Sequence, residues 1–95
     1  MKTLEFPITK KGFSYELIER VGQWALIEQV DLKYPDAPRR FEVWQIQEQK
    51  YREHRGVIYE EKEMMPEGED WGTYGWSFFE LRDAINWFKS KIRGE

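Results

Sequence analysis

The sequence predicts an α+β fold, in which a three- to four-stranded antiparallel sheet (a β-meander) is followed by one C-terminal amphipathic helix packed on one face. Three observations predict it. Residues 13–20 alternate apolar and polar side chains, with the period of a half-buried strand. Residues 24–30 and 41–47 are rich in strand-forming side chains. Residues 77–93 carry apolar side chains at helical spacing.

Length and composition indicate one globular domain. The chain has 95 residues, of which 40% are hydrophobic, 35% charged and 17% aromatic. A disordered chain of this charge would lack so many aromatic side chains. We expect an N-terminal segment at 1–12, strands within 13–63, a loop at 64–76 and a helix at 77–93.

The strands are expected to follow one another through short turns. Gly22 supplies a turn between the first two strands, and residues 57–61 form a short fourth strand. Residues 45–55 could be strand or helix, and we favour strand because a helix there would have almost no apolar face. The second and third strands carry apolar side chains on both faces: Trp24, Leu26 and Val30 oppose Ala25 and Ile27, and Phe41 and Val43 oppose Trp44 and Ile46.

The C-terminal helix has start and stop signals. Ser77 and Glu80 have the spacing of a capping box, and Gly94 stands where a C′ glycine would end the helix. The apolar stripe expected to pack on the sheet consists of Phe78, Leu81, Ile85, Phe88 and Ile92. Because one helix cannot cover both faces of a sheet, we expect the second face to be used in a homodimer.

The residue types present argue against an enzyme. Cysteine is absent and His54 is the sole histidine, which leaves no thiolate, no Ser–His pair close in sequence and few ligands for a metal. We therefore expect no catalytic residue, no metal and no cofactor. The N-terminal residues lack a secretory or membrane-spanning apolar run, so we expect a soluble, cytoplasmic protein without a membrane partner.

The charges are unevenly distributed. The formal net charge is −3, but residues 49–58 carry +2 and residues 59–71 carry −5. A basic patch beside an acidic one favours contacts with a protein. The acidic block leads into an aromatic segment at 71–76, whose rings either lock the helix onto the strands or stay exposed as partner anchors. The candidate partner-binding residues are Glu67, Glu69, Asp70, Trp71 and Tyr74.

Single-stranded nucleic acid is the alternative partner, because exposed aromatic side chains beside Lys and Arg can stack bases. A sequence pI of about 5.3 argues against it, since neutralising phosphates needs clustered positive charge. The residues that would make these contacts are Arg39, Arg40, Lys50, Tyr51, Arg52 and Arg55.

A family resemblance rests on the segments at 15–20, 25–29 and 41–46 and on the run that closes the series, Trp71-Gly72-Thr73-Tyr74-Gly75-Trp76-Ser77-Phe78. The chain resembles small uncharacterised proteins of bacteriophages and other mobile elements, over residues 13–90. The resemblance implies a setting in which short proteins act by binding a host or viral macromolecule, and it implies no reaction. We therefore expect a non-catalytic interaction module that engages a host protein through residues 60–76.

Overall fold

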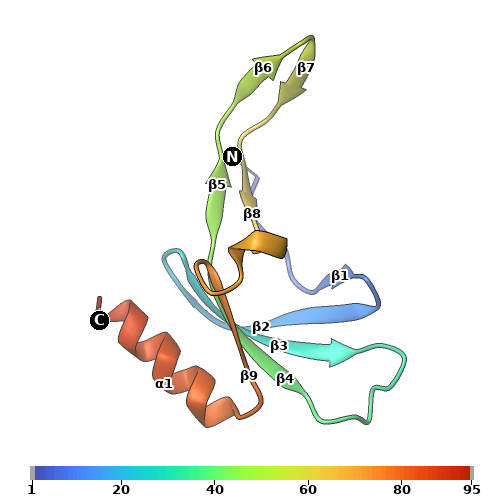
Figure 1. Ribbon diagram of the computed structural model, residues 1–95, viewed down its shortest axis with the longest axis vertical. Helices are drawn as coiled ribbons and strands as arrows, with labels where there is room; N and C mark the ends of the chain where they lie inside the picture. Colours follow the sequence, from blue (N-terminus) through green and yellow to red (C-terminus); the bar gives the residue numbers. More distant parts are fainter. Residues whose placement is uncertain (1, 95) are drawn as a thin grey trace.

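The computed structural model, which describes residues 2–94, confirms the α+β class. Five antiparallel strands form a sheet in the order β1-β2-β3-β4-β9, and a single C-terminal helix, α1, packs against one face (Figure 1). The bounds are β1 Ile8–Lys10, β2 Phe13–Val21, β3 Trp24–Asp31, β4 Arg40–Gln45, β9 Gly75–Phe78 and α1 Leu81–Ile92.

The predicted hairpin between the first two long strands is confirmed. Val21 of β2 pairs with Trp24 of β3, so the loop has two residues, and Gly22 takes a positive φ of 59° there. Two-residue hairpin loops require such left-handed conformations, which glycine adopts without steric cost.

The sheet contains two short strands, β1 and β9, that the sequence did not indicate. β1 lies in the N-terminal segment and pairs Ile8 with Tyr15, while β9 lies across the predicted boundary between loop and helix and pairs Trp76 with Val43. Both strands have only three or four residues. A run that short shows no clear alternation, so pairing with a distant strand decides its conformation.

The predicted start of the helix is wrong, and its end is confirmed. Ser77 pairs with Glu42 inside β9, and the helix begins at Leu81 with Glu80 as its N-cap, so Ser77 and Glu80 do not form a capping box. Gly94 has a φ of 82°, as expected of a C′ glycine. The capping-box spacing placed the helix start four residues too early, because residues 75–78 pair with β4 and belong to the sheet.

Apolar cores lie on both faces of the sheet. The helix side is built from Leu26, Val43, Ala84 and Phe88, and the opposite side from Tyr15, Ala25, Ile27, Trp44 and Ile46. The predicted two-sided burial of β3 and β4 is therefore confirmed. The opposite side is covered by side chains of the same chain, namely Leu4, Phe6, Ile8, Phe13 and Met65. The reason given for a homodimer, an uncovered second face, is therefore wrong.

A two-stranded arm, residues 47–64, extends from the end of β4 away from the sheet (Figure 1). Its base is a pair of strands, β5 Gln47–Gln49 and β8 Lys62–Met64, and its tip is a second pair, β6 Arg52–His54 and β7 Val57–Tyr59. The preference for strand over helix in this region is confirmed. The predicted fourth strand ends at Tyr59 and joins the arm, and the following loop contains the short 3₁₀ helix η1, Gly68–Asp70.

Candidate functional site

The tip of the arm, residues 50–58, projects away from the sheet (Figure 1). Every residue in this range is exposed to solvent. Three of its large side chains are apolar or aromatic, and their exposed fractions are 58% for Tyr51, 51% for Val57 and 59% for Ile58. None of the three belongs to either apolar core of the sheet.

The tip also carries positive charge. It contains Lys50, Arg52 and Arg55 against the single carboxylate of Glu53. Arg52 pairs with Tyr59 across the ribbon, and its guanidinium carbon lies 4.6 Å from the centroid of the Tyr59 ring. The tip therefore combines cations with apolar side chains, and its turn is closed by positive φ values at Arg55 and Gly56.

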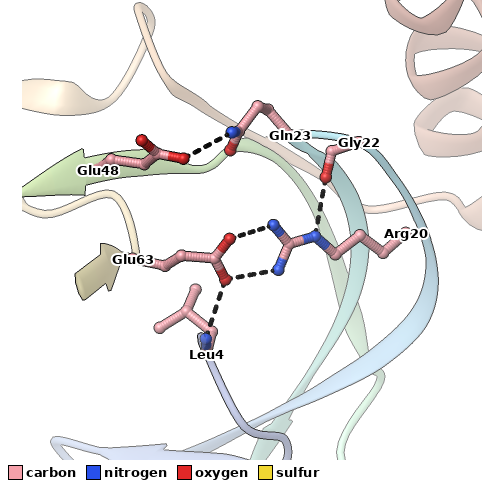
Figure 2. A network of polar contacts seen from close by, with 6 residues as sticks. All are labelled: Leu4, Arg20, Gly22, Gln23, Glu48 and Glu63. Atoms are coloured by element: carbon pink, nitrogen blue, oxygen red, sulfur yellow. Dashed lines mark hydrogen bonds and ion pairs between the residues drawn. The ribbon is translucent and has the colours of Figure 1, made fainter. Parts of the chain in front are cut away.

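The base of the arm is fixed to the sheet by a two-pronged ion pair between Arg20 of β2 and Glu63 of β8 (Figure 2). Nη1 of Arg20 donates to Oε1 of Glu63 at 2.7 Å, and Nη2 donates to Oε2 at 2.5 Å. The third guanidinium nitrogen, Nε of Arg20, donates to the carbonyl oxygen of Gly22 at 2.9 Å. The backbone N–H of Leu4 donates to Oε1 of Glu63 at 3.0 Å. This planar pairing fixes both position and orientation.

The ion pair stays charged at neutral pH. Glu63 is only 9% exposed, and the hydrogen bonds from Arg20 lower the pKa of its carboxyl against the opposing effect of burial. The same hydrogen bond raises the pKa of Arg20. A buried carboxylate without this partner would carry an uncompensated desolvation cost, so each group requires the other.

Further hydrogen bonds hold both strands of the arm base. Nε2 of Gln23, in the β2–β3 turn, donates to Oε1 of Glu48 at 3.2 Å (Figure 2). On the other strand, the backbone N–H of Glu63 donates to the carbonyl of Lys2 at 2.8 Å. The arm thus has a tethered base and a fully exposed tip.

Several carboxylates of the predicted acidic patch already have partners within the chain. Glu63 is paired as described, Glu67 forms an ion pair with Lys10, and Glu60 lies 3.5 Å from Lys2. Oδ2 of Asp70 accepts the backbone N–H of Glu67 at 3.0 Å. Glu69 remains exposed. The structure therefore does not present the acidic block as one continuous run of free carboxylates.

The aromatic segment divides between the two faces of the sheet. Trp76 stacks at 5.9 Å from Trp24 and lies 5.5 Å from Trp87, so this ring does join the helix to the strands. Trp71 is 39% exposed, and its indole lies over Gly75 beside a hollow of about 410 Å³ that Tyr15 of the opposite core also lines. Tyr74 is half-buried.

The residues of the nucleic-acid alternative are not brought together. Lys50, Tyr51, Arg52 and Arg55 lie on the arm tip, whereas Arg39 and Arg40 lie at the start of β4, the end farthest from the arm (Figure 1). The two arginines also have other partners: Arg39 forms an ion pair with Glu28 at 2.7 Å, and Arg40 lies 4.7 Å from the Phe79 ring centroid.

Across residues 2–94 no group of three or more His, Asp or Glu side chains is placed to hold a metal ion. His54 is exposed on the tip and pairs with Val57. No helix in this part of the chain has the length and apolar character needed to cross a membrane.

Sequence reasoning missed the residues that position the arm. Arg20 and Glu63 are 43 residues apart, and nothing in either local pattern links them. The tip did carry a signal, because Val57 and Ile58 are adjacent apolar residues beside the basic run at 50–55. Adjacent residues of a strand face opposite sides, so Val57 and Ile58 place one apolar side chain on each face of the ribbon.

Comparison of the chain with models of protein families, with curated proteins and with solved structures finds no match.

Proposed function

We propose that this chain is a non-catalytic interaction module that engages a partner protein through the tip of its arm, residues 50–58. One observation carries the proposal: a projecting ribbon whose base is fixed by the partly buried Arg20–Glu63 pair and whose tip is exposed at every residue. A fixed base reduces the conformational entropy that a partner must remove on binding. An ordered arm whose tip is exposed is better suited to binding a partner than to stabilising the fold.

The chemistry of the tip specifies the partner surface. Tyr51, Val57 and Ile58 offer apolar contact area, and Lys50, Arg52 and Arg55 flank it with positive charge. The complementary surface is an apolar strip bordered by carboxylates, because burying the side chains stabilises the complex and opposite charges align it. This proposal moves the contact from residues 60–76 to the tip, since several of those carboxylates already have partners within the chain.

The setting proposed is the cytoplasm, and the resemblance to mobile-element proteins implies a host or viral macromolecule as the partner, here a protein. Single-stranded nucleic acid is the second candidate, favoured by the grouping of Lys50, Tyr51, Arg52 and Arg55 on one ribbon. With three cations on the tip and a net charge of −3 on the whole chain, phosphate binding has a weak electrostatic basis.

A pull-down with three baits tests the proposal. The wild type is compared with an arm variant, Tyr51→Ser with Ile58→Ser, and with a control that removes exposed apolar side chains elsewhere, Leu32→Ser with Phe79→Ser. These four side chains are all exposed, so each variant should keep the wild-type circular dichroism spectrum. Each bait is used with and without nuclease, and retained proteins are identified by mass spectrometry.

The expected result is a protein retained by the wild type and the control, lost by the arm variant and insensitive to nuclease. Equal retention by all three baits would remove the arm from the contact. Retention of nucleic acid, with affinity falling steeply between about 50 and 200 mM salt, would replace the protein partner with nucleic acid.

A further inference from the structure

Beyond Tyr15, the outer edge of β2 has no strand partner in the described part of the chain. β1 pairs only with residues 13–15 of β2, while β3 pairs with β2 along its whole length on the other side. Among residues 2–94, the main chain of residues 16–21 has no further strand partner and no other backbone hydrogen bond on the outer side. An unpaired edge presents N–H and C=O groups that can accept another strand.

This edge is both apolar and acidic. Leu17, Ile18 and Val21 are 39%, 46% and 42% exposed, and the carboxylates of Glu16 and Glu19 are exposed between them. Beside the edge lies a hollow of about 490 Å³, lined by Leu4, Phe6, Pro7, Glu16 and Leu17. The edge therefore matches the surface that the arm tip requires: an apolar strip, a hollow for a side chain and bordering carboxylates.

The lengths of the pairing segments also agree. A bulge between Leu17 and Glu19 interrupts the register of β2, so the uninterrupted edge beyond it is residues 19–21. β6 and β7 each have three residues, and each has one unpaired edge. A three-residue pairing is short, and it would depend on side-chain contacts, such as Ile58 in the hollow, for most of its stability.

We propose that the occupant of the β2 edge is the arm tip of a second copy of this chain, in a reciprocal dimer. The inference rests on the proposed function, in which the arm tip is the binding element. The arm points away from its own sheet, so its tip cannot lie on its own β2 (Figure 1). Around a two-fold axis each copy gives one arm and receives one, and every contact occurs twice.

The charges favour this arrangement. The cations of the tip, Arg52 and Arg55, would face Glu16 and Glu19 of the other copy across the contact. Glu16 is only loosely engaged within its own chain, at 3.9 Å from Arg39. Pairing through one strand of the ribbon leaves the opposite strand edge of the arm open, so a dimer can still bind a further protein.

Charge-reversal variants of the full chain test the dimer by analytical ultracentrifugation over a range of concentrations. The edge variant is Glu16→Lys with Glu19→Lys, and the arm variant is Arg52→Glu with Arg55→Asp, where Asp tolerates the positive φ at that position. Reversal of Arg82 and Lys33 to Glu gives a control with the same charge change as the arm variant at exposed sites elsewhere.

The wild type and the control should sediment at twice the monomer mass of 11.6 kDa. Each reversal variant alone should dissociate at least about tenfold more readily, because like charges then meet in both copies of the contact. An equimolar mixture of the two variants should restore the dimer, since both of its contacts pair opposite charges again.

A monomeric wild type, or a dimer unaffected by both reversals, would overturn the inference. So would a mixture that stays monomeric while each variant keeps the wild-type circular dichroism spectrum. These results are distinguishable from failure of the proposed function: a monomeric chain whose arm still retains a protein in the pull-down keeps the function and loses only the dimer.

Discussion

Arg20 and Glu63 join the central sheet to the arm through two parallel hydrogen bonds, across 43 residues of sequence. Figure 2 shows this pair at the centre of the contacts at the arm base, with the Leu4 N–H on the same carboxylate and the Gly22 carbonyl on the guanidinium. This charged pair, whose carboxylate is shielded from water, therefore contributes to the direction of the arm together with the Gln23–Glu48 and Glu63–Lys2 hydrogen bonds.

Glu63→Gln should loosen the arm more than the sheet. The neutral amide turns a donor toward Arg20, so the free energy of unfolding should fall by about 1–3 kcal/mol. Hydrogen exchange should accelerate at the amides of residues 47–64 and stay near wild type in β3 and β4. Glu61→Gln, at an exposed neighbouring position, is the control and should change neither quantity. Uniform acceleration across the chain would contradict a local role.

The stability that Glu63 supplies should disappear in acid. Arg20 lowers its folded-state pKa below the usual glutamate value of about 4.3, so the contribution is fully present above that pH. It is lost as the pH falls through the lowered value. In urea titrations, the gap between wild type and Glu63→Gln should therefore be widest near pH 7 and shrink in acid. A gap independent of pH would show that the charge of Glu63 is not what stabilises the arm.

Glu42 should show the opposite pH dependence. This carboxyl is 4% exposed, and burial raises its pKa against the hydrogen bond it accepts from Nε1 of Trp44 at 2.8 Å. A raised folded-state pKa favours the fold below the unfolded value and loses that contribution as the pH rises. Relative to wild type, Glu42→Gln should become progressively more stable from pH 4 upward. A trend in the other direction would contradict the buried environment of Glu42.

Phe88 and Leu81 should differ sharply when truncated to alanine. Phe88 is 1% exposed in the helix-side core, so its loss leaves a cavity and should cost about 3–5 kcal/mol of unfolding free energy. Leu81 is 39% exposed in the first helical turn and should cost less than about 1 kcal/mol. Chemical denaturation of the two variants measures both. Equal costs would contradict the observed orientation of α1.

Gly75→Ala should displace Trp71. A Cβ at Gly75 would lie 2.7 Å from the Trp71 ring, closer than such atoms can approach, and at a tight 3.0 Å from Pro66. We expect a loss of about 1–3 kcal/mol from overpacking, with a change in tryptophan fluorescence. The double variant Gly75→Ala with Trp71→Ala should lose less than the sum of the single variants, because the clash is then absent. Additive losses would place the strain elsewhere.

Local patterns in the sequence determined the α+β class, the β2–β3 hairpin and the body of the helix. Alternation at residues 13–20, the positive φ required of Gly22 and the C′ glycine at Gly94 each act within a few residues, so they can be interpreted without knowing the rest of the chain. The same holds for the charge contrast between residues 49–58 and 59–71. These features supported the hypothesis of an interaction module but did not determine which surface makes the contact.

Tertiary structure alone decided the features that define the candidate site. β9 exists because β4 offers an unpaired edge to residues 75–78, which overrides the capping signal at Ser77 and Glu80. The second face of the sheet is covered because the N-terminal segment folds across it. Arg20 and Glu63, which help to hold the arm, lie on β2 and β8, two strands far apart in sequence. Each of these depends on chain segments far apart in sequence, and local propensity carries no information about which distant segments will pair.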